Sequence, residues 1–307
     1  MIALCWALSC TLWWTASHAS EPCRIAFDIG SSGIRAGASN SDVITRANID
    51  YLAALRVGGS LDQTVAPTVA AFRGLTEQGG FATDCLRVGG GYSAWRLALQ
   101  QDTGNVIANL ATIKQASGVA VLVIPQNVEG GYGFFGARQL LGDRLVTSHV
   151  LDIGGGSLQI AGERTSFGDA LGQKLWHQQL CLALRDTKEQ PCVLAPMAKD
   201  ERAIARALLA QKLDGIRMAL PDQITITAVS RPVTQGVAPA VARLLSKPPG
   251  QPVLSGAELA SAIEQIGDLT LEETALSLGI PVEYAAYLLS DMLLVEGLLQ
   301  ATATDQL

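Results

Sequence analysis

Residues 151–159 read Leu-Asp-Ile-Gly-Gly-Gly-Ser-Leu-Gln, and this stretch is the most informative one in the chain. An apolar run ends in Asp152 and is followed by three glycines, which is the pattern of a strand that enters a tight loop. Glycine has no Cβ, so the backbone amides of residues 154–157 can wrap around an anion. The Asp152 carboxylate can hold a metal ion or a water molecule where the strand ends.

A shorter version of the same pattern lies upstream. Residues 27–33 read Phe-Asp-Ile-Gly-Ser-Ser-Gly, with Asp28 at the end of the apolar run. The chain has 307 residues, which is enough for two ordinary domains. Two Asp-Ile-Gly loops therefore predict two lobes, each of which offers a phosphate-binding loop to a shared cleft.

Composition and charge narrow the class of protein and of partner. Hydrophobic residues make up 49% of the chain and charged residues 16%, which indicates a folded core rather than disorder. The net charge of −6 gives no basic field for nucleic acid, so we expect no nucleic-acid partner. A polyanionic ligand would need a local cluster of cations or a metal ion to offset the repulsion.

The N-terminus has the composition of a secretory signal peptide. The first 19 residues contain no Lys, Arg, Asp or Glu, and the small residues Ser17 and Ala19 fit the cleavage rule. We predict a signal peptide at 1–19, although its usual basic start is missing; an N-terminal membrane anchor or a buried strand is the alternative. No later run of about 18 apolar residues follows, so the mature protein is expected to be periplasmic or secreted and not membrane-embedded.

Four cysteines lie beyond the predicted signal peptide. An even number in an exported protein is typical of disulfides. Cys181 and Cys192 are separated by ten residues and would close a local loop. Cys23 and Cys85 each precede an apparent strand, and neighbouring parallel strands could align them. Four buried thiols are the alternative, and the spacing argues against zinc or thioredoxin chemistry.

Strand and helix patterns alternate along the chain, which predicts an α/β architecture. We expect lobes at 20–143 and 144–307. A glycine loop at 88–91 should form a turn before a helix, and a further loop is expected at 247–252. Strands are expected at 24–29, 34–38, 42–50, 119–124, 148–153, 157–163 and 224–229, and helices at 61–78, 92–101, 128–141, 173–184, 198–213, 232–245 and 281–301.

With these loops placed, the chain resembles the exopolyphosphatase/guanosine pentaphosphatase (Ppx/GppA) phosphatase family. Residues 26–35 are similar to the family's first phosphate loop, and residues 152–157 to its second. Residues 124–137 resemble the segment with the catalytic glutamate, and residues 93–96 the stretch with a phosphate-binding arginine. The order and spacing of these motifs hold from about residue 24 to residue 163. The resemblance implies a two-lobed actin-like, ribonuclease-H-like fold with the ligand cleft between the lobes.

The resemblance also implies a role for each motif residue in the hydrolysis of a phosphoanhydride. Glu129 would be the general base that activates water, with Asp152 and Gln159 as further catalytic residues. Asp28 and Asp152 would hold Mg²⁺, a hard cation that suits carboxylates and phosphates. The expected phosphate-binding residues are Gly30, Ser31, Ser32, Gly33, Arg96, Gly154, Gly155, Gly156 and Ser157. The expected ligand is polyphosphate or another phosphoanhydride. A homodimer is one possible oligomeric state.

Each role has a structural alternative. Asp28 and Asp152 could cap turns at strand ends, Arg96 could pair with a carboxylate on the surface of its helix, and Glu129 could be a solvated helix residue. Arg35 follows the first loop and faces either phosphate or solvent. His149 and His177 have no evident partners, so we expect them in the core or on the surface rather than in catalysis.

Departures from the family pattern leave three hypotheses. Gln159 stands where the family usually has glutamate, Ser32 where it has asparagine and Val128 where it has an acidic residue. The loop on the adenosine side and the Arg-Ala-Asp signature are missing at 228–232 and 284–286. The first hypothesis is an exported, Mg²⁺-dependent hydrolase of polyphosphate, in preference to guanosine penta- or tetraphosphate. The second is a binding or sensor module that lost turnover through Gln159. The third is an actin-like ATPase or kinase, which the missing loop disfavours.

Overall fold

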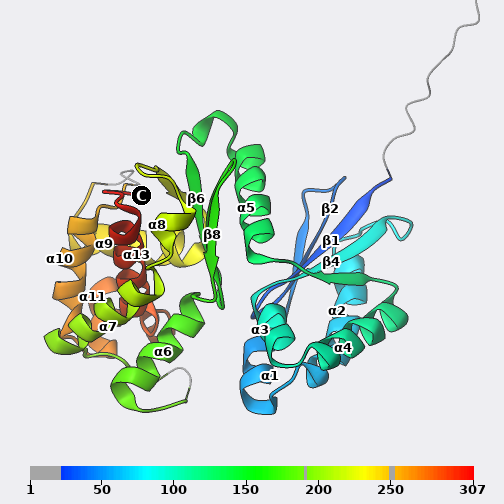
Figure 1. The fold of residues 1–307 in the computed structure, drawn as a ribbon, viewed down its shortest axis with the longest axis horizontal. Coiled ribbons are helices and arrows are strands. Elements are labelled where there is room, and N and C mark those ends of the chain that lie inside the picture. The colour runs from blue at the N-terminus through cyan, green and yellow to red at the C-terminus, as the bar shows by residue number, and fades with distance from the viewer. Residues whose placement is uncertain (1–21, 190–191, 249–252) are drawn as a thin grey trace, which may run out of the picture.

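The computed structural model of the chain describes residues 22–189, 192–248 and 253–307. Two lobes stand side by side, each built on a mixed β-sheet, with helix α5 (Gln126–Leu141) between them (Figure 1). The signal peptide predicted at 1–19 and part of the loop predicted at 247–252 lie outside the described residues. The two-lobed α/β architecture agrees with the expected fold class.

The first lobe contains a five-stranded sheet in the order β3-β2-β1-β4-β5. Strand β2 is antiparallel to both of its neighbours, β1 and β3, and β4 and β5 run parallel to β1. Because parallel strands end at the same edge of a sheet, the carboxyl ends of β1 and β4 lie together. The strands are β1 (Arg24–Ile29), β2 (Gly33–Ala38), β3 (Ile44–Asn48), β4 (Leu86–Gly91) and β5 (Ala120–Val123).

Helices cover the face of this sheet that carries its apolar side chains. Alternate residues of β1 are buried, so Ile25, Phe27 and Ile29 point into the core while Asp28 lies on the other face. The ring of Phe27 contacts that of Phe72 at a centroid distance of 4.4 Å. The helices are α1 (Tyr51–Gly58), α2 (Asp62–Gln78), α3 (Ser93–Gln101) and α4 (Thr103–Ser117). The sequence pattern indicated α2 and α3, but it did not reveal α1 or α4.

The predicted glycine loop at 88–91 is wrong, because β4 continues through all three glycines. These glycines provide space rather than a turn. A Cβ at Gly89 would lie 2.9 Å from Val121 Cγ2, and one at Gly91 would lie 2.9 Å from Trp95 Cγ. Neither has a positive φ angle. The strand therefore runs directly to Tyr92, where α3 begins.

The second lobe has a four-stranded sheet in the order β8-β7-β6-β9, with β6 antiparallel to β7 and parallel to β9. Its strands are β6 (His149–Ile153), β7 (Leu158–Gly162), β8 (Ser166–Asp169) and β9 (Ile226–Ala228). Its helical elements are η1 (Gly142–Arg144), α6 (Gln173–Arg185), α7 (Lys199–Lys212), α8 (Ile216–Ala219), η2 (Pro232–Val237), α9 (Ala238–Leu244), α10 (Gly256–Gly267), α11 (Leu271–Leu278), α12 (Val282–Ala285) and α13 (Leu288–Thr302).

Helix α13 forms the centre of this lobe. Twelve of its 15 residues are buried, so it is covered on all sides by α6, α7, α10 and η2. The helix predicted at 281–301 is divided into α12 and α13, and the one predicted at 232–245 into the π-helical turn η2 and α9. Strand β8 and helices α10 and α11 were not predicted.

Helix α5 precedes the predicted lobe boundary at 143–144 but packs on the second sheet. Its residues Phe134 and Ala137 form a small cluster with Val150 of β6 and Ala161 of β7. This packing favours a division nearer the end of β5, and the boundary at 143–144 stays a prediction.

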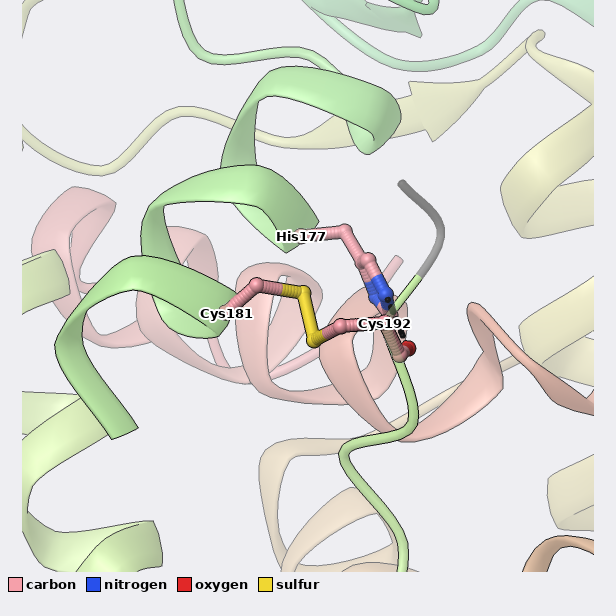
Figure 2. Close-up of side chains that lie close together, drawn as sticks. All are labelled: His177, Cys181 and Cys192. Carbon is pink, nitrogen blue, oxygen red and sulfur yellow. Dashed lines mark hydrogen bonds between the residues drawn. A yellow bond between two sulfur atoms is a disulfide. The ribbon is translucent and has the colours of Figure 1, made fainter. Parts of the chain in front are cut away.

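Two disulfides form in the predicted pairing. Cys23 and Cys85 precede the parallel neighbours β1 and β4, and their Cα atoms are 4.8 Å apart. Cys181 of α6 is bonded to Cys192 in the following loop, with the Cα atoms 5.9 Å apart. Figure 2 shows this bond beside His177, whose Nε2 donates to the carbonyl oxygen of Cys192 at 3.0 Å. His177 and His149 are both buried, and neither lines the cleft described below.

In the described part of the chain, no single helix is long and apolar enough to cross a membrane. One pair, Leu271–Leu278 with Val282–Thr302, meets the criteria of length and composition together but is bent by 108°.

Candidate functional site

A cleft of about 910 Å³ lies between the lobes, and both Asp-Ile-Gly loops contribute to its wall. Residues 229–243 and 278–291 line its further end. The predicted site residues that line it are Asp28, Gly30, Ser31, Ser32, Gly33, Glu129, Asp152, Gly154, Gly155 and Ser157. The other three, Arg96, Gly156 and Gln159, lie behind this wall and contact the lining residues.

The two loops share one backbone arrangement. The amide of Gly30 donates to the carbonyl of Gly33 at 2.9 Å, and that of Gly154 donates to the carbonyl of Ser157 at 2.8 Å. Each bond closes the turn of an antiparallel hairpin, β1–β2 in the first lobe and β6–β7 in the second. The two turns also touch, because a Cβ on Gly155 would lie 2.4 Å from Ser31 Oγ. The glycine loops of the two lobes thus meet at one point, and their binding of phosphate stays a prediction.

Helix α6 supports the second loop from behind. The amides of Gln173 and Lys174 donate to the carbonyls of Gly154 and Gly155 at 2.9 and 2.8 Å. Gly172 packs so closely that a Cβ there would lie 2.4 Å from the amide nitrogen of Ser157. The Gln173 side chain also donates to Asp291 of α13, and burial raises the pKa of Asp291 to about 8. The loop is therefore held by two helices of the second lobe.

Glu129 lies in the first turn of α5, where the chain leaves β5 through Pro125. Its Oε2 accepts from Arg96 Nη1 at 2.7 Å and from Gln159 Nε2 at 3.0 Å. The side chain is only 21% exposed, and that of Arg96 only 13%. Glu129 is thus neither a solvated helix residue nor a member of a surface pair, but part of a network that joins both lobes.

Burial raises the pKa of Glu129 to about 7. Arg96 opposes this rise through its charge and its hydrogen bond, while Asp152 and Asp28 add to it. A carboxylate with a pKa close to neutral can accept a proton from water and release it again, which suits a general base.

Arg96 makes three polar contacts with protein atoms in this arrangement. Besides Glu129, it donates to the carbonyl of Ile124 at 2.9 Å and to Ser157 Oγ at 3.0 Å. The last contact links Arg96 to the second loop, because Ser157 belongs to that loop. Gln159 also donates to Ser157 Oγ, at 3.2 Å. Arg96 therefore positions both Glu129 and Ser157, and its predicted direct bond to phosphate stays a prediction.

Asp28 and Asp152 lie close enough to influence each other. Burial raises the pKa of Asp28, and Arg35, with Nη1 3.7 Å from Asp28 Oδ2, lowers it. Burial also raises the pKa of Asp152; the charge of Asp28 raises it further, and Arg35 lowers it. Two carboxylates that repel each other beside backbone amides fit a hard divalent cation, which would relieve the repulsion. Asp28 and Asp152 are thus suitable ligands for Mg²⁺.

Several cleft residues other than Arg35 were missed at the level of sequence. Five basic side chains line the cleft and offset the net charge of −6 locally: Arg35, Arg46, Lys174, Arg231 and Arg243. Arg46 lies opposite Arg35 in the β2–β3 register, which the predicted hairpin could have revealed. Tyr92 also lines the cleft, directly after the glycines of β4. No motif marks Tyr92, and only the path of β4 brings it there.

Comparison with known structures identifies the fold. The chain is similar to the Ppx/GppA phosphatase of Aquifex aeolicus, with a TM-score of 0.68, 17% identity and coverage of 93% of this chain and 92% of that one. The type II variant of that phosphatase gives a TM-score of 0.65, 16% identity and coverage of 93% and 94%. An exopolyphosphatase of Cytophaga hutchinsonii gives a TM-score of 0.62, with 17% identity and coverage of 92% of each chain. The chain therefore has the two-lobed actin-like fold of these proteins over nearly its whole length.

No family model and no curated protein matches the chain. At 16–17% identity, the structural likeness establishes the fold. The activity has to be argued from the chemistry of the cleft.

Proposed function

We propose that the protein is a phosphoanhydride hydrolase of the Ppx/GppA type that uses Mg²⁺ and acts on inorganic polyphosphate. One observation carries the proposal: Glu129, whose burial raises its pKa to about 7, lies where both glycine loops and both aspartates meet. Phosphoanhydride hydrolysis needs an activated water, a clamp on the phosphoryl group and relief of the charge on the leaving group. The cleft contains a candidate for each.

In the proposed reaction, Glu129 accepts a proton from a water molecule whose oxygen attacks the terminal phosphorus. The anhydride P–O bond breaks, and the shortened chain leaves with the electron pair. Amides of the two loops bind the transferring phosphoryl group, and Arg96 and Gln159 hold Glu129 in place through their hydrogen bonds. Asp28 and Asp152 would hold Mg²⁺, which would supply positive charge to offset that of the phosphates.

Polyphosphate is preferred over guanosine penta- or tetraphosphate because we also propose that the protein is exported. The apolar start of the sequence and the two disulfides support export to the periplasm or the medium, away from cytosolic nucleotides. The five basic side chains of the cleft supply the counter-charge that a polyanion needs.

The test is phosphate release by the mature protein from polyphosphate, guanosine tetraphosphate and ATP, with and without Mg²⁺. We expect polyphosphate to be hydrolysed fastest, and Glu129→Gln to lower the rate by roughly 10²- to 10⁴-fold. Glu163→Gln is the matched control, because Glu163 is 67% exposed and outside the cleft. Absence of phosphate release from polyphosphate, or an unchanged rate in Glu129→Gln, would refute the proposal.

A binding or sensor module is the second candidate, and Gln159 favours it. Gln159 is buried and brings a neutral amide, rather than a charge, to the base. Calorimetric binding of polyphosphate without turnover would support this function. Gln159→Glu separates the two candidates: a large gain in phosphate release indicates a scaffold that had lost activity, whereas no gain indicates that Gln159 suits the active enzyme.

A further inference from the structure

Tyr92 occupies a position in the cleft that the proposed reaction has not yet used. It is the residue between β4 and α3, and its ring lies across Gly90. A Cβ on Gly90 would be 2.7 Å from Tyr92 Oη and 3.0 Å from Cζ. Gly90 is paired with Asp28 in the parallel register of β1 and β4. Because adjacent strands are separated by about 4.8 Å, the phenol lies about one strand spacing from Asp28, on the cleft side of the sheet.

The Tyr92 hydroxyl is a proton donor for which the described part of the chain offers no acceptor. No hydrogen bond joins it to another residue within 22–189, 192–248 or 253–307, although Tyr92 is half-buried and lines the cleft. Burial raises its pKa to about 12, and the charges of Asp28 and Glu129 contribute to the rise. The hydroxyl therefore keeps its proton at physiological pH, within electrostatic range of the proposed base and of one proposed metal ligand.

We propose that Tyr92 is a substrate-contacting residue whose hydroxyl donates a hydrogen bond to a non-bridging oxygen of the phosphoryl group that water attacks. This inference rests on the proposed function. A neutral donor suits this position because it stabilises the negative charge of the phosphoryl oxygens without pairing permanently with Asp28 or Glu129. A lysine or arginine there would form an ion pair with these carboxylates instead.

The glycine run of β4 accounts for the position of the ring. Gly90 leaves the space in which the ring rests, and any side chain there would displace the hydroxyl. Gly91 leaves the space for Trp95 of α3, which is fully buried. The segment from Gly89 to Trp95 therefore forms one packed unit that holds the phenol at the cleft wall.

Two variants test the inference by different routes. Tyr92→Phe removes only the hydroxyl, and we expect kcat for polyphosphate to fall by roughly 10²-fold with KM changed by less than about threefold. Gly90→Ala keeps the hydroxyl but displaces it, and the same loss is expected. The matched control is Tyr132→Phe on α5, because Tyr132 is 62% exposed and does not line the cleft. The thermal midpoint of Tyr92→Phe should equal that of the wild type.

A wild-type kcat in Tyr92→Phe overturns the inference while the proposed function stands. A raised Mg²⁺ requirement at unchanged saturating rate also overturns it, because the hydroxyl then acts on Asp28. If the wild-type protein releases no phosphate, the proposed function fails and binding decides the role of Tyr92. In that case, an affinity for polyphosphate at least about fivefold weaker in Tyr92→Phe supports the contact, and an equal affinity overturns it.

Discussion

The first and second hairpins of the cleft have the same backbone but different residues opposite the aspartate. Asp28 of the first hairpin is paired with Arg35, and Asp152 of the second is paired with Gln159. In both, the amide two residues after the aspartate donates to the carbonyl three residues further along. The shared backbone brings two aspartates and two sets of amides to one place, and the residue opposite each aspartate determines its charge environment.

Because of this difference, the aspartates of the two lobes have different charge environments. In the first lobe the opposing residue is a cation, and Asp28 and Arg35 are both about half-exposed. In the second lobe it is a buried amide that donates a hydrogen bond to Glu129. The charge of Asp152 therefore has no cation on its own hairpin to offset it, and the candidate base is attached to the second hairpin. We infer that the second lobe contributes more to metal binding and catalysis than the first.

The largest expected effect comes from removing each aspartate charge in turn. Asp152→Asn should lower phosphate release by at least about 10²-fold and raise the Mg²⁺ concentration for half-maximal rate, because a proposed metal ligand without a compensating cation on its hairpin is lost. Asp28→Asn should lower the rate of phosphate release by roughly tenfold, because Arg35 already offsets part of the Asp28 charge. Rates measured across a Mg²⁺ titration give both quantities.

The control for this pair is Asp143→Asn, since Asp143 is exposed and lies outside the cleft. If Asp28→Asn proves more damaging than Asp152→Asn, the first hairpin dominates and the inferred asymmetry is wrong.

The next effect concerns the pH dependence. The proposed base Glu129 can accept a proton only when it is ionised, and burial raises its pKa to about 7. The rate should therefore rise with pH through about 7, fall roughly tenfold per pH unit below it and level off above it. Gln159→Leu removes a donor that stabilises the ionised form, so the midpoint should move upward and the rate at pH 6.5 should fall about tenfold further.

Because the substrate titrates in the same way with both proteins, a difference between their pH–rate profiles belongs to the protein. Arg35→Gln is the matched variant on the other hairpin, and its midpoint should remain close to that of the wild type. A midpoint that stays in place in Gln159→Leu would mean that the amide does not stabilise the ionised base.

The same comparison explains what the sequence could reveal. Each hairpin is a local structure, and alternation of apolar residues around a glycine turn is enough to predict it. The network of Arg96, Glu129 and Gln159 joins residues 30 or more positions apart, so their mutual bonds depend on how the lobes pack. The resemblance to a family indicated all three residues but not the contacts among them.

The glycines of β4 are the opposite case. In the sequence, the glycines at 89–91 look like those of the two loops. The sequence does not distinguish a glycine that allows a turn from one that leaves space for a neighbouring side chain. Only the packed structure distinguishes them, by the side chains that occupy the space. Tyr92 was missed for this reason, since its place in the cleft depends on β4 continuing to its end.

The smallest expected effect comes from making the first hairpin resemble the second. In Arg35→Gln, Asp28 loses a cation that is half-exposed and 3.7 Å away, and exposed ion pairs of this kind contribute about 0–1 kcal/mol. The thermal midpoint should hardly change. At low salt, the Mg²⁺ concentration for half-maximal rate should fall by about two- to threefold, because Arg35 no longer competes with Mg²⁺ beside the proposed ligand Asp28. This difference between variant and wild type should shrink at high salt. Arg46→Gln, one strand further from Asp28, should give a smaller change. A loss of rate greater than about tenfold in Arg35→Gln would instead mean that Arg35 binds the phosphate chain directly, and the asymmetry between the hairpins would then reflect substrate binding rather than charge compensation.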